Sequence, residues 1–164
     1  MILASDFVDA ACNANYKFYA GVPCSFLTPF INYVIANKNT TYVSAANEGD
    51  AVAMAAGASL GGVRSIAMMQ NSGLGNAISP LTSLTHTFNL PILLICTLRG
   101  EPGLNDEPQH ELMGEITCEL LEKIKILIFY YFWYFKRSYT SFQWKFLYSG
   151  NGIFFYVFSL HIGI

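Results

Sequence analysis

The chain has 164 residues, enough for one domain with a sizeable core, and a net charge of −2 at pH 7. This charge offers no basic surface for nucleic acid, which we exclude as a partner. Hydrophobic residues make up 53% of the chain and charged residues 12%, against about 25% charged in ordinary globular proteins. Such an apolar chain either attaches to a membrane or hides much of its surface against a partner.

The cysteines and the N-terminal segment bear on where the protein works. The four cysteines match no zinc-binding or CxxC spacing. Reduced thiols are typical of cytoplasmic proteins, so we expect a cytoplasmic location. The N-terminal segment has no basic stretch and carries Asp6 and Asp9 early. We therefore expect no cleaved signal peptide.

Strand and helix patterns alternate along the first 125 residues. Ser5 is expected to cap the first helix. The strands are apolar throughout, which is typical of a parallel sheet buried on both faces. We therefore predict an α/β three-layer sandwich with a mainly parallel sheet and helices on both faces. The expected helices span residues 6–15, 25–36 or 28–36, 51–60, 77–87 and 110–123, and the expected strands span residues 17–20, 41–45, 65–69 and 91–97.

Residues 126–164 differ sharply in composition from residues 1–125, which we take as the domain. The last 39 positions hold 16 of the 25 aromatic residues and no acidic residue. A membrane anchor is one interpretation, although residues 149–152 interrupt the longest apolar run. An edge strand plus helix completing the sheet is a second. We favour the third, a non-native or frameshifted extension, and assign the tail no function.

Four polar segments each follow a predicted strand. They span residues 21–25, 47–50, 70–73 and 99–110. Because right-handed crossovers place these segments at one edge of a parallel sheet, we expect them to converge. Ligands of open α/β sheets bind outside the carboxyl ends of the strands, so the pattern predicts a binding site there. The chain has no complete GxGxxG, no GxxxxGK[ST] and no GxSxG motif, which argues against a dinucleotide, P-loop or serine-hydrolase site.

The segments ANEGDAVAMAAG, MQNSGLGNAISPLTSL and LRGEPGLNDEPQHELMG, with the opening GVPCSFLTPFINYV, resemble a known family. They are similar to the N-terminal, pyrimidine-binding domain of thiamine-diphosphate-dependent phosphonopyruvate decarboxylases and of the sulfopyruvate decarboxylase alpha subunit. The resemblance covers residues 5–125. It implies a carboxy-lyase acting on a 3-substituted pyruvate.

The resemblance also implies partners. In this family another domain or subunit holds the cofactor's diphosphate and Mg²⁺ with a GDG…N motif, which this sequence lacks. We therefore expect an oligomer with a diphosphate-binding partner, no metal ligands in this chain and no activity without that partner. Two alternatives stay open: an inactive truncated fragment of such an enzyme, and a membrane-attached protein anchored by the tail.

The resemblance assigns cofactor-binding residues. It places Glu48 at the pyrimidine nitrogen N1′, where a carboxyl group favours the imino form that activates the cofactor. Position alone indicates only an acidic residue favoured by a helix N-terminus. Asn71, Ser72 and Gly73 are expected to approach the pyrimidine, or else to form a turn before a helix. Cys24 departs from the family, which usually has Asp there.

Substrate-binding and proton-transfer residues follow from the same resemblance. Ser25 is expected to face substrate, or else to cap a helix. Arg99 is expected to pair with the anionic group of the substrate, or else with Glu101 or Asp106. His110 is expected to move protons or contact substrate, or else to be structural.

Overall fold

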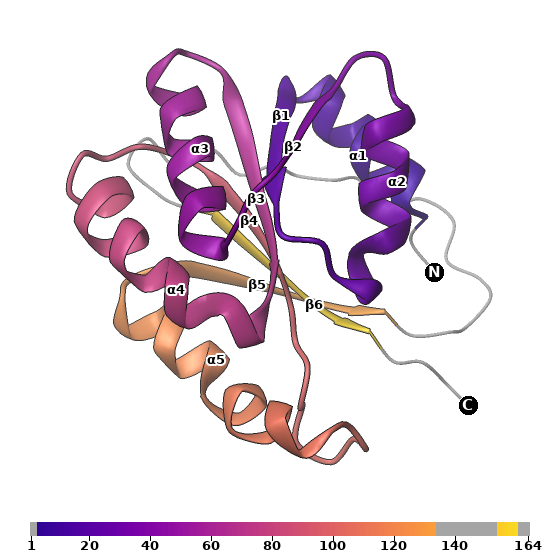
Figure 1. Cartoon of the computed structure of the whole chain (residues 1–164), viewed down its shortest axis with the longest axis vertical. Helices are drawn as coiled ribbons and strands as arrows, with labels where there is room; N and C mark the ends of the chain where they lie inside the picture. Colours follow the sequence, from indigo (N-terminus) through magenta and orange to yellow (C-terminus); the bar gives the residue numbers. More distant parts are fainter. Residues whose placement is uncertain (1–2, 134–153, 161–164) are drawn as a thin grey trace.

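A computed structural model of the chain describes residues 3–133 and 154–160 and shows one six-stranded sheet (Figure 1). The order of the strands is β2-β1-β3-β4-β6-β5, and every neighbouring pair is parallel. The predicted parallel sheet is therefore confirmed. The strands are β1 Tyr16–Gly21, β2 Thr41–Ser44, β3 Arg64–Gln70, β4 Leu93–Thr97, β5 Leu127–Trp133 and β6 Phe154–Leu160.

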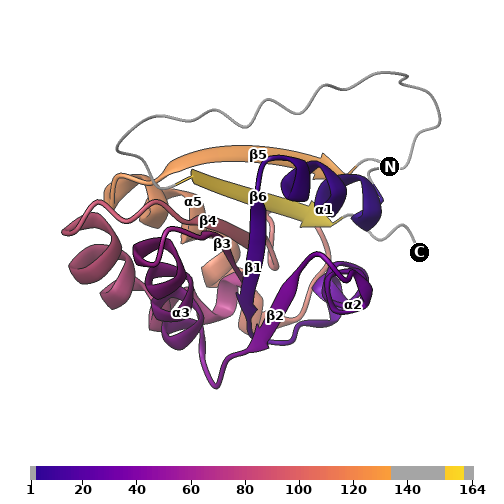
Figure 2. The same ribbon diagram turned by 90° about the horizontal axis from the view of Figure 1, so that it is seen from above.

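Helices cover both faces of the sheet (Figure 2). One face carries α1 Ala4–Asn13 and α2 Thr28–Ala36. The other carries α3 Glu48–Leu60, α4 Leu74–Ser79 and α5 Glu111–Lys123. The predicted three-layer sandwich is confirmed. Shorter elements are the 3₁₀ helices η1 Ser25–Leu27, η2 Asn71–Gly73 and η4 Pro108–His110, and the π-helix η3 Pro80–His86.

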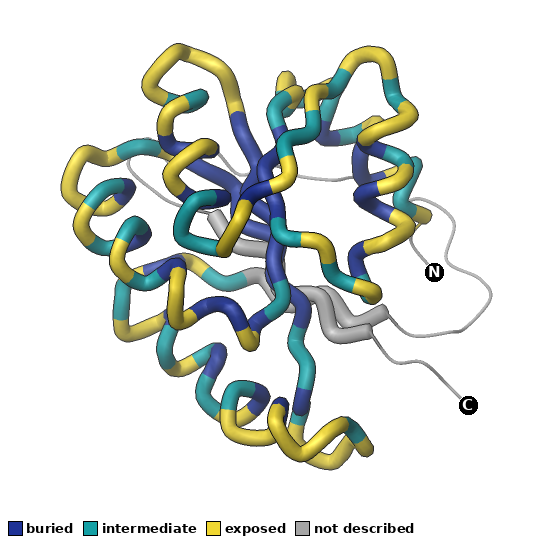
Figure 3. Tube along the Cα trace, in the orientation of Figure 1, coloured by how far each residue is buried: buried dark blue, intermediate teal, exposed yellow. Residues whose placement is uncertain are grey.

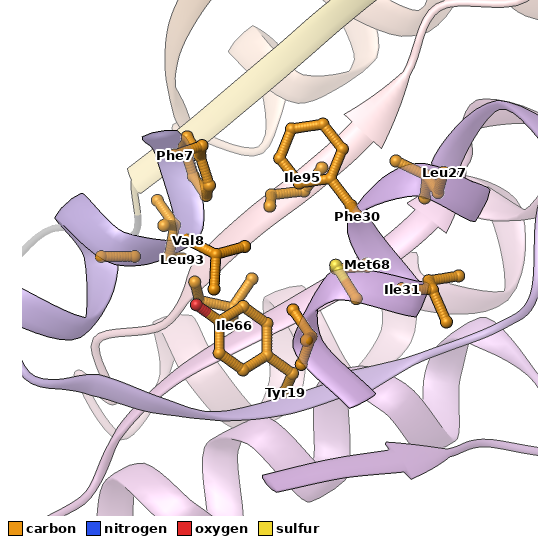
Figure 4. Packing of buried hydrophobic residues seen from close by; sticks show 12 residues of the cluster. Phe7, Val8, Tyr19, Leu27, Phe30, Ile31, Ile66, Met68, Leu93 and Ile95 are labelled. Atoms are coloured by element: carbon orange, nitrogen blue, oxygen red, sulfur yellow. The ribbon is translucent and has the colours of Figure 1, made fainter. Parts of the chain in front are cut away.

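Alternate strand residues divide the core between the two faces. On the α1–α2 side, Phe7 and Phe30 pack edge to face with ring centroids 5.5 Å apart, above Ile66 and Met68 (Figure 4). On the other side, the neighbouring residue Met69 packs with α3, α4 and α5. β3 and β4 are buried along almost their whole length (Figure 3). These strands are apolar throughout because both of their faces are covered.

Two helix starts differ from the sequence prediction. Ser5 does not cap α1, because the helix begins at Ala4 and Leu3 holds the N-cap position without a side-chain hydrogen bond. α3 begins at Glu48 and not at residue 51. The Asn47 side chain accepts a hydrogen bond from the Asp50 N–H at 3.0 Å, and this cap extends the helix into the polar segment.

The segment after β3 also differs from prediction. Residues 70–76 were expected to form a loop, but Gln70 ends β3 and α4 already begins at Leu74. The expected helix over residues 77–87 is divided into α4 and the π-helix η3, which begins at Pro80. Proline has no N–H to donate, so it removes one helical hydrogen bond and helps the chain change to the wider π spacing.

The aromatic-rich tail contributes two strands to the sheet. β6 lies between β4 and β5, and β5 forms the edge. Residues 134–153 and 161–164 lie outside the described residues. The domain boundary at residue 125 and the non-native origin of the tail therefore stay predictions. None of the helices in the described ranges combines the length and apolar character needed to cross a bilayer.

Candidate functional site

The carboxyl ends of β1 to β4 lie along one edge of the sheet. Gly21, near the end of β1, pairs with Ser44 of β2 and Met68 of β3, and Gln70 pairs with Thr97 of β4. The four polar segments leave the sheet from these positions. Their predicted convergence is confirmed by side-chain contacts that join each segment to the one that follows β3.

The segment after β2 contributes Glu48, which is half-buried in the first turn of α3. Its Oε2 accepts a hydrogen bond from Asn76 Nδ2 at 2.9 Å. Within the described part of the chain, no hydrogen bond to its Oε1 is present. The carboxyl group lies against Gly73, where an added Cβ would lie 2.0 Å from both Cδ and Oε1. Glycine at position 73 thus gives the carboxyl group its space.

Asn71 joins the segments after β3 and β4. Its buried amide nitrogen donates to the Arg99 carbonyl at 2.8 Å and to Thr117 Oγ1 at 3.1 Å. Its Oδ1 accepts from the Arg99 N–H at 3.0 Å. These bonds hold the two loops together, so the Asn71 side chain has a structural role. The exposed Ser72 accepts from Gln70 Nε2 at 2.6 Å.

Arg99 forms a bidentate ion pair with Asp106. Its Nε lies 2.7 Å from Oδ2, and its Nη2 contacts Oδ1. The guanidinium group lies over the Phe26 ring, 4.3 Å from the centroid. The pairing raises the pKa of Arg99. Chiefly through the Arg99 hydrogen bonds, and also through those from His110 and two backbone N–H groups, the pKa of Asp106 falls well below its usual range.

His110 lies at the junction of η4 and α5 and is buried. Its Nδ1 is 3.1 Å from Asp106 Oδ1, and its Nε2 is 3.4 Å from Gln70 Nε2. Arg99 and His110, which the sequence analysis named separately, are thus brought together by Asp106.

Two glycines allow the loop after β4 to pack on α5. A Cβ on Gly114 would lie 1.7 Å from the Gly100 carbonyl oxygen. Gly100 has φ +72°, and a Cβ there would lie 2.1 Å from the His110 carbonyl oxygen. This close approach of backbones sets the position of His110 beside the loop that carries Arg99.

Ser25 is exposed within η1, and Cys24 precedes it at the N-cap position. The alternative that Ser25 caps a helix is therefore wrong. Cys24 Sγ donates to Gln70 Oε1 at 3.3 Å, which ties the segment after β1 to the end of β3.

The sequence analysis gave no role to Gln70 or Asn76, and it named Asp106 only as an alternative partner of Arg99, an ion pair that is present in the structure. Gln70 could have been found as the first polar residue after a buried strand. The contact of Asp106 with His110 could have been found from their i, i+4 spacing. The described residues hold no group of three or more His, Cys, Asp or Glu side chains that could bind a metal ion.

Residues 1–120 match the family described as thiamine pyrophosphate enzyme, N-terminal TPP binding domain. The chain belongs to this family. Thiamine pyrophosphate is thiamine diphosphate, so the match agrees with the resemblance found in the sequence. The matched residues include β1 to β4 and most of α5.

Relatives of the domain are decarboxylases. Phosphonopyruvate decarboxylase of Streptomyces viridochromogenes is 52% identical over 122 residues, which cover 74% of this chain and 31% of that relative. The alpha subunit of sulfopyruvate decarboxylase from Methanococcus maripaludis is 34% identical over 121 residues, covering 73% of this chain and 71% of the subunit. The chain thus spans about a third of the first relative and most of the second.

Solved structures agree on the fold of the domain. A structure from Mycobacterium smegmatis, described as a thiamin diphosphate-dependent enzyme, superposes with TM-score 0.61 at 16% identity, covering 97% of this chain and 30% of that chain. Benzoylformate decarboxylase from Polynucleobacter necessarius superposes with TM-score 0.51 at 22% identity, covering 58% and 18% of the two chains.

Proposed function

We propose that the chain is the pyrimidine-binding part of a thiamine-diphosphate-dependent decarboxylase that acts on a 3-substituted pyruvate, either phosphonopyruvate or sulfopyruvate. The observation that carries the proposal is the Glu48 carboxyl group. It lies at the carboxyl edge of the sheet, on Gly73, with Oε1 free of hydrogen bonds from the described residues. The names of the relatives support the substrate class.

The residues of the site fit an aminopyrimidine ring. A ring nitrogen such as N1′ needs one carboxyl partner, and Glu48 offers it, while Asn76 holds the other oxygen. Glu48 would hold a proton toward N1′ and so would set the protonation state of the pyrimidine. When bound, thiamine diphosphate supplies an electron sink for the loss of CO₂ from a 2-oxo acid. Ser72 and Gly73 would approach the ring, whereas Asn71 would act by holding their loop.

Substrate contacts are proposed for Ser25, Arg99 and His110. Asp106 accepts from the Nε–H and from one N–H of Nη2 of Arg99, so Nη1 and the second N–H of Nη2 would remain to bind a phosphonate, sulfonate or carboxylate. His110 lies beside this group and can exchange a proton at Nε2. Exposed Ser25 would add a hydroxyl group from the segment after β1.

The chain would act within an assembly. We propose that a second domain or subunit holds the diphosphate and Mg²⁺, because the sequence has no GDG…N motif. A relative that is named an alpha subunit supports a partner subunit. The free cysteines agree with the cytoplasmic location that we propose.

Reconstitution tests the proposal. The chain is mixed with a candidate diphosphate-binding partner, thiamine diphosphate and Mg²⁺, and CO₂ release is compared for phosphonopyruvate, sulfopyruvate and pyruvate. Glu48→Gln should lower turnover by roughly 10²–10⁴-fold, the usual effect of losing an acid–base group. Glu115→Gln, at an exposed position of α5, is the matched control. Wild-type turnover in Glu48→Gln would contradict the role of Glu48, and no CO₂ release from any partner would favour the inactive fragment.

A further inference from the structure

Five nitrogen atoms lie within hydrogen-bond distance of the Asp106 carboxylate. It accepts hydrogen bonds from Nε and Nη2 of Arg99, from the backbone N–H groups of Gly100 and Glu107, and lies 3.1 Å from His110 Nδ1. An ionised carboxylate can only accept hydrogen bonds. The low pKa of Asp106 keeps it ionised. His110 Nδ1 must therefore carry a proton in this contact.

The opposite edge of the imidazole faces an amide nitrogen. Gln70 Nε2 lies 3.4 Å from His110 Nε2 and donates to Ser72 Oγ at 2.6 Å. The Cys24 thiol donates to Gln70 Oε1, which directs the amide oxygen to Cys24 and the amide nitrogen to His110. An amide nitrogen donates and does not accept. His110 Nε2 must therefore be the acceptor.

The two sides of the ring thus require the same proton position. We propose that Asp106 is a positioning residue, which fixes His110 as a neutral imidazole protonated at Nδ1 with its Nε2 lone pair directed to the amide nitrogen of Gln70. The hydrogen bond at one ring nitrogen sets the protonation of the other. His110 is then prepared to accept a proton at Nε2. The effect of this on turnover rests on the proposed function, whereas the proton position does not.

The competing arrangement has the Gln70 amide turned over. Its oxygen would then accept from a protonated Nε2, and His110 would carry a positive charge between Gln70 and Asp106. On the imidazole ring, the two arrangements differ in the proton at Nε2, so an experiment that detects this proton decides between them.

The protonation of the His110 ring nitrogens is measured by ¹⁵N NMR of the full chain with ¹⁵N-labelled histidine at about pH 7. Two-bond ¹H–¹⁵N correlations distinguish a protonated ring nitrogen from an unprotonated one. His110→Gln identifies the His110 signals among the three histidines. We expect Nδ1 protonated and Nε2 unprotonated in the wild-type chain. A protonated Nε2 would overturn the proposal without need of any variant.

Two variants test what sets the proton position. Asp106→Asn places an amide that can donate to Nδ1, so the proton should move in large part to Nε2. Gln70→Glu places a second carboxylate at Nε2 and should give a doubly protonated ring even if Asp106→Asn folds poorly. Asp9→Asn on α1, far along the chain, is the control and should leave the His110 signals unchanged. Unchanged His110 signals in both Asp106→Asn and Gln70→Glu would sink the idea.

Turnover provides a second, separable readout in the reconstituted assembly. Asp106→Asn should lower kcat by at least tenfold and move the acid limb of the pH–activity profile to lower pH, because a protonated His110 would lose its carboxylate partner. If the wild-type proton position is as proposed but no assembly releases CO₂, the proposed function fails and the role of Asp106 in fixing His110 stands.

Discussion

The Glu48 side chain depends on a neighbouring glycine, which has no side chain of its own. The Glu48 carboxyl group occupies the space that a Cβ on Gly73 would need. The next glycine along the chain, Gly75, is exposed in α4, and a Cβ there would meet nothing within 4 Å. Gly73 is therefore needed for the position of Glu48, whereas Gly75 is an ordinary helix residue that could carry a side chain.

Gly73→Ala should therefore displace Glu48 from its position. We expect a loss of turnover on the order of 10²-fold, the effect of roughly 1 Å misplacement of a catalytic group, with about 1–3 kcal/mol of destabilisation from overpacking. Gly75→Ala should keep turnover and stabilise the fold by about 0.5–1 kcal/mol. CO₂ release and urea unfolding measure the two effects. Equal behaviour of the two variants would contradict the contact between Gly73 and Glu48.

Asp106 gives the fold a dependence on acid pH. Its pKa is lowered in the folded state, so its ion pair with Arg99 stabilises the protein above the unfolded-state pKa of about 4, and this stabilisation is lost as the pH falls below that value. Asp106→Asn should cost about 2 kcal/mol at neutral pH. That difference in the free energy of unfolding should shrink on acidification from about pH 5 to pH 3. A difference that stays constant over this range would count against the ion pair.

At the scale of elements, sequence patterns predicted every strand of residues 1–125 to within one or two residues. They succeeded because buried strands such as Leu93–Thr97 are apolar on both faces. They failed at the start of α3, because polarity alone does not separate a loop from a capped first turn such as that of Asn47 and Glu48. The ion pair of Arg99 with Asp106 was one of the sequence alternatives, but the contact of Asp106 with His110 was missed, because it depends on how the segment over residues 99–110 folds.

The packing of the β4 loop on α5 is the contact between elements that matters most for the site. Gly114→Ala would place a Cβ against the Gly100 carbonyl oxygen, which can give way only if the backbone shifts. We expect a loss of about 3 kcal/mol or more in the free energy of unfolding, and a changed His110 NMR signal. Gly57→Ala, in the equally long α3 and with open space around it, should instead gain about 0.5–1 kcal/mol. Chemical denaturation of both variants checks the contrast.

At the scale of the whole molecule, the question is what the aromatic-rich tail adds to the domain. Family similarity ends near residue 120, yet β6 pairs with β4 along residues 93–97. β4 is buried on both faces and shows the character of a central strand. Without β6, its backbone N–H and C=O groups on one side would form an unpaired edge, which favours association with other chains.

A chain ended at residue 125 should therefore self-associate, whereas one ended at residue 160, which keeps β6, should not. Light scattering during concentration and the midpoint of thermal unfolding would compare the two at equal protein concentration. Addition of a diphosphate-binding partner tests whether self-association of the shorter chain comes from a β4 edge that the partner normally covers. If the partner restores a monodisperse assembly to the shorter chain, the β4 edge is a surface that the native enzyme covers with other residues. A shorter chain that is monomeric and as stable as the longer one would show that β4 needs no neighbour on that side, and would favour residue 125 as the end of the domain.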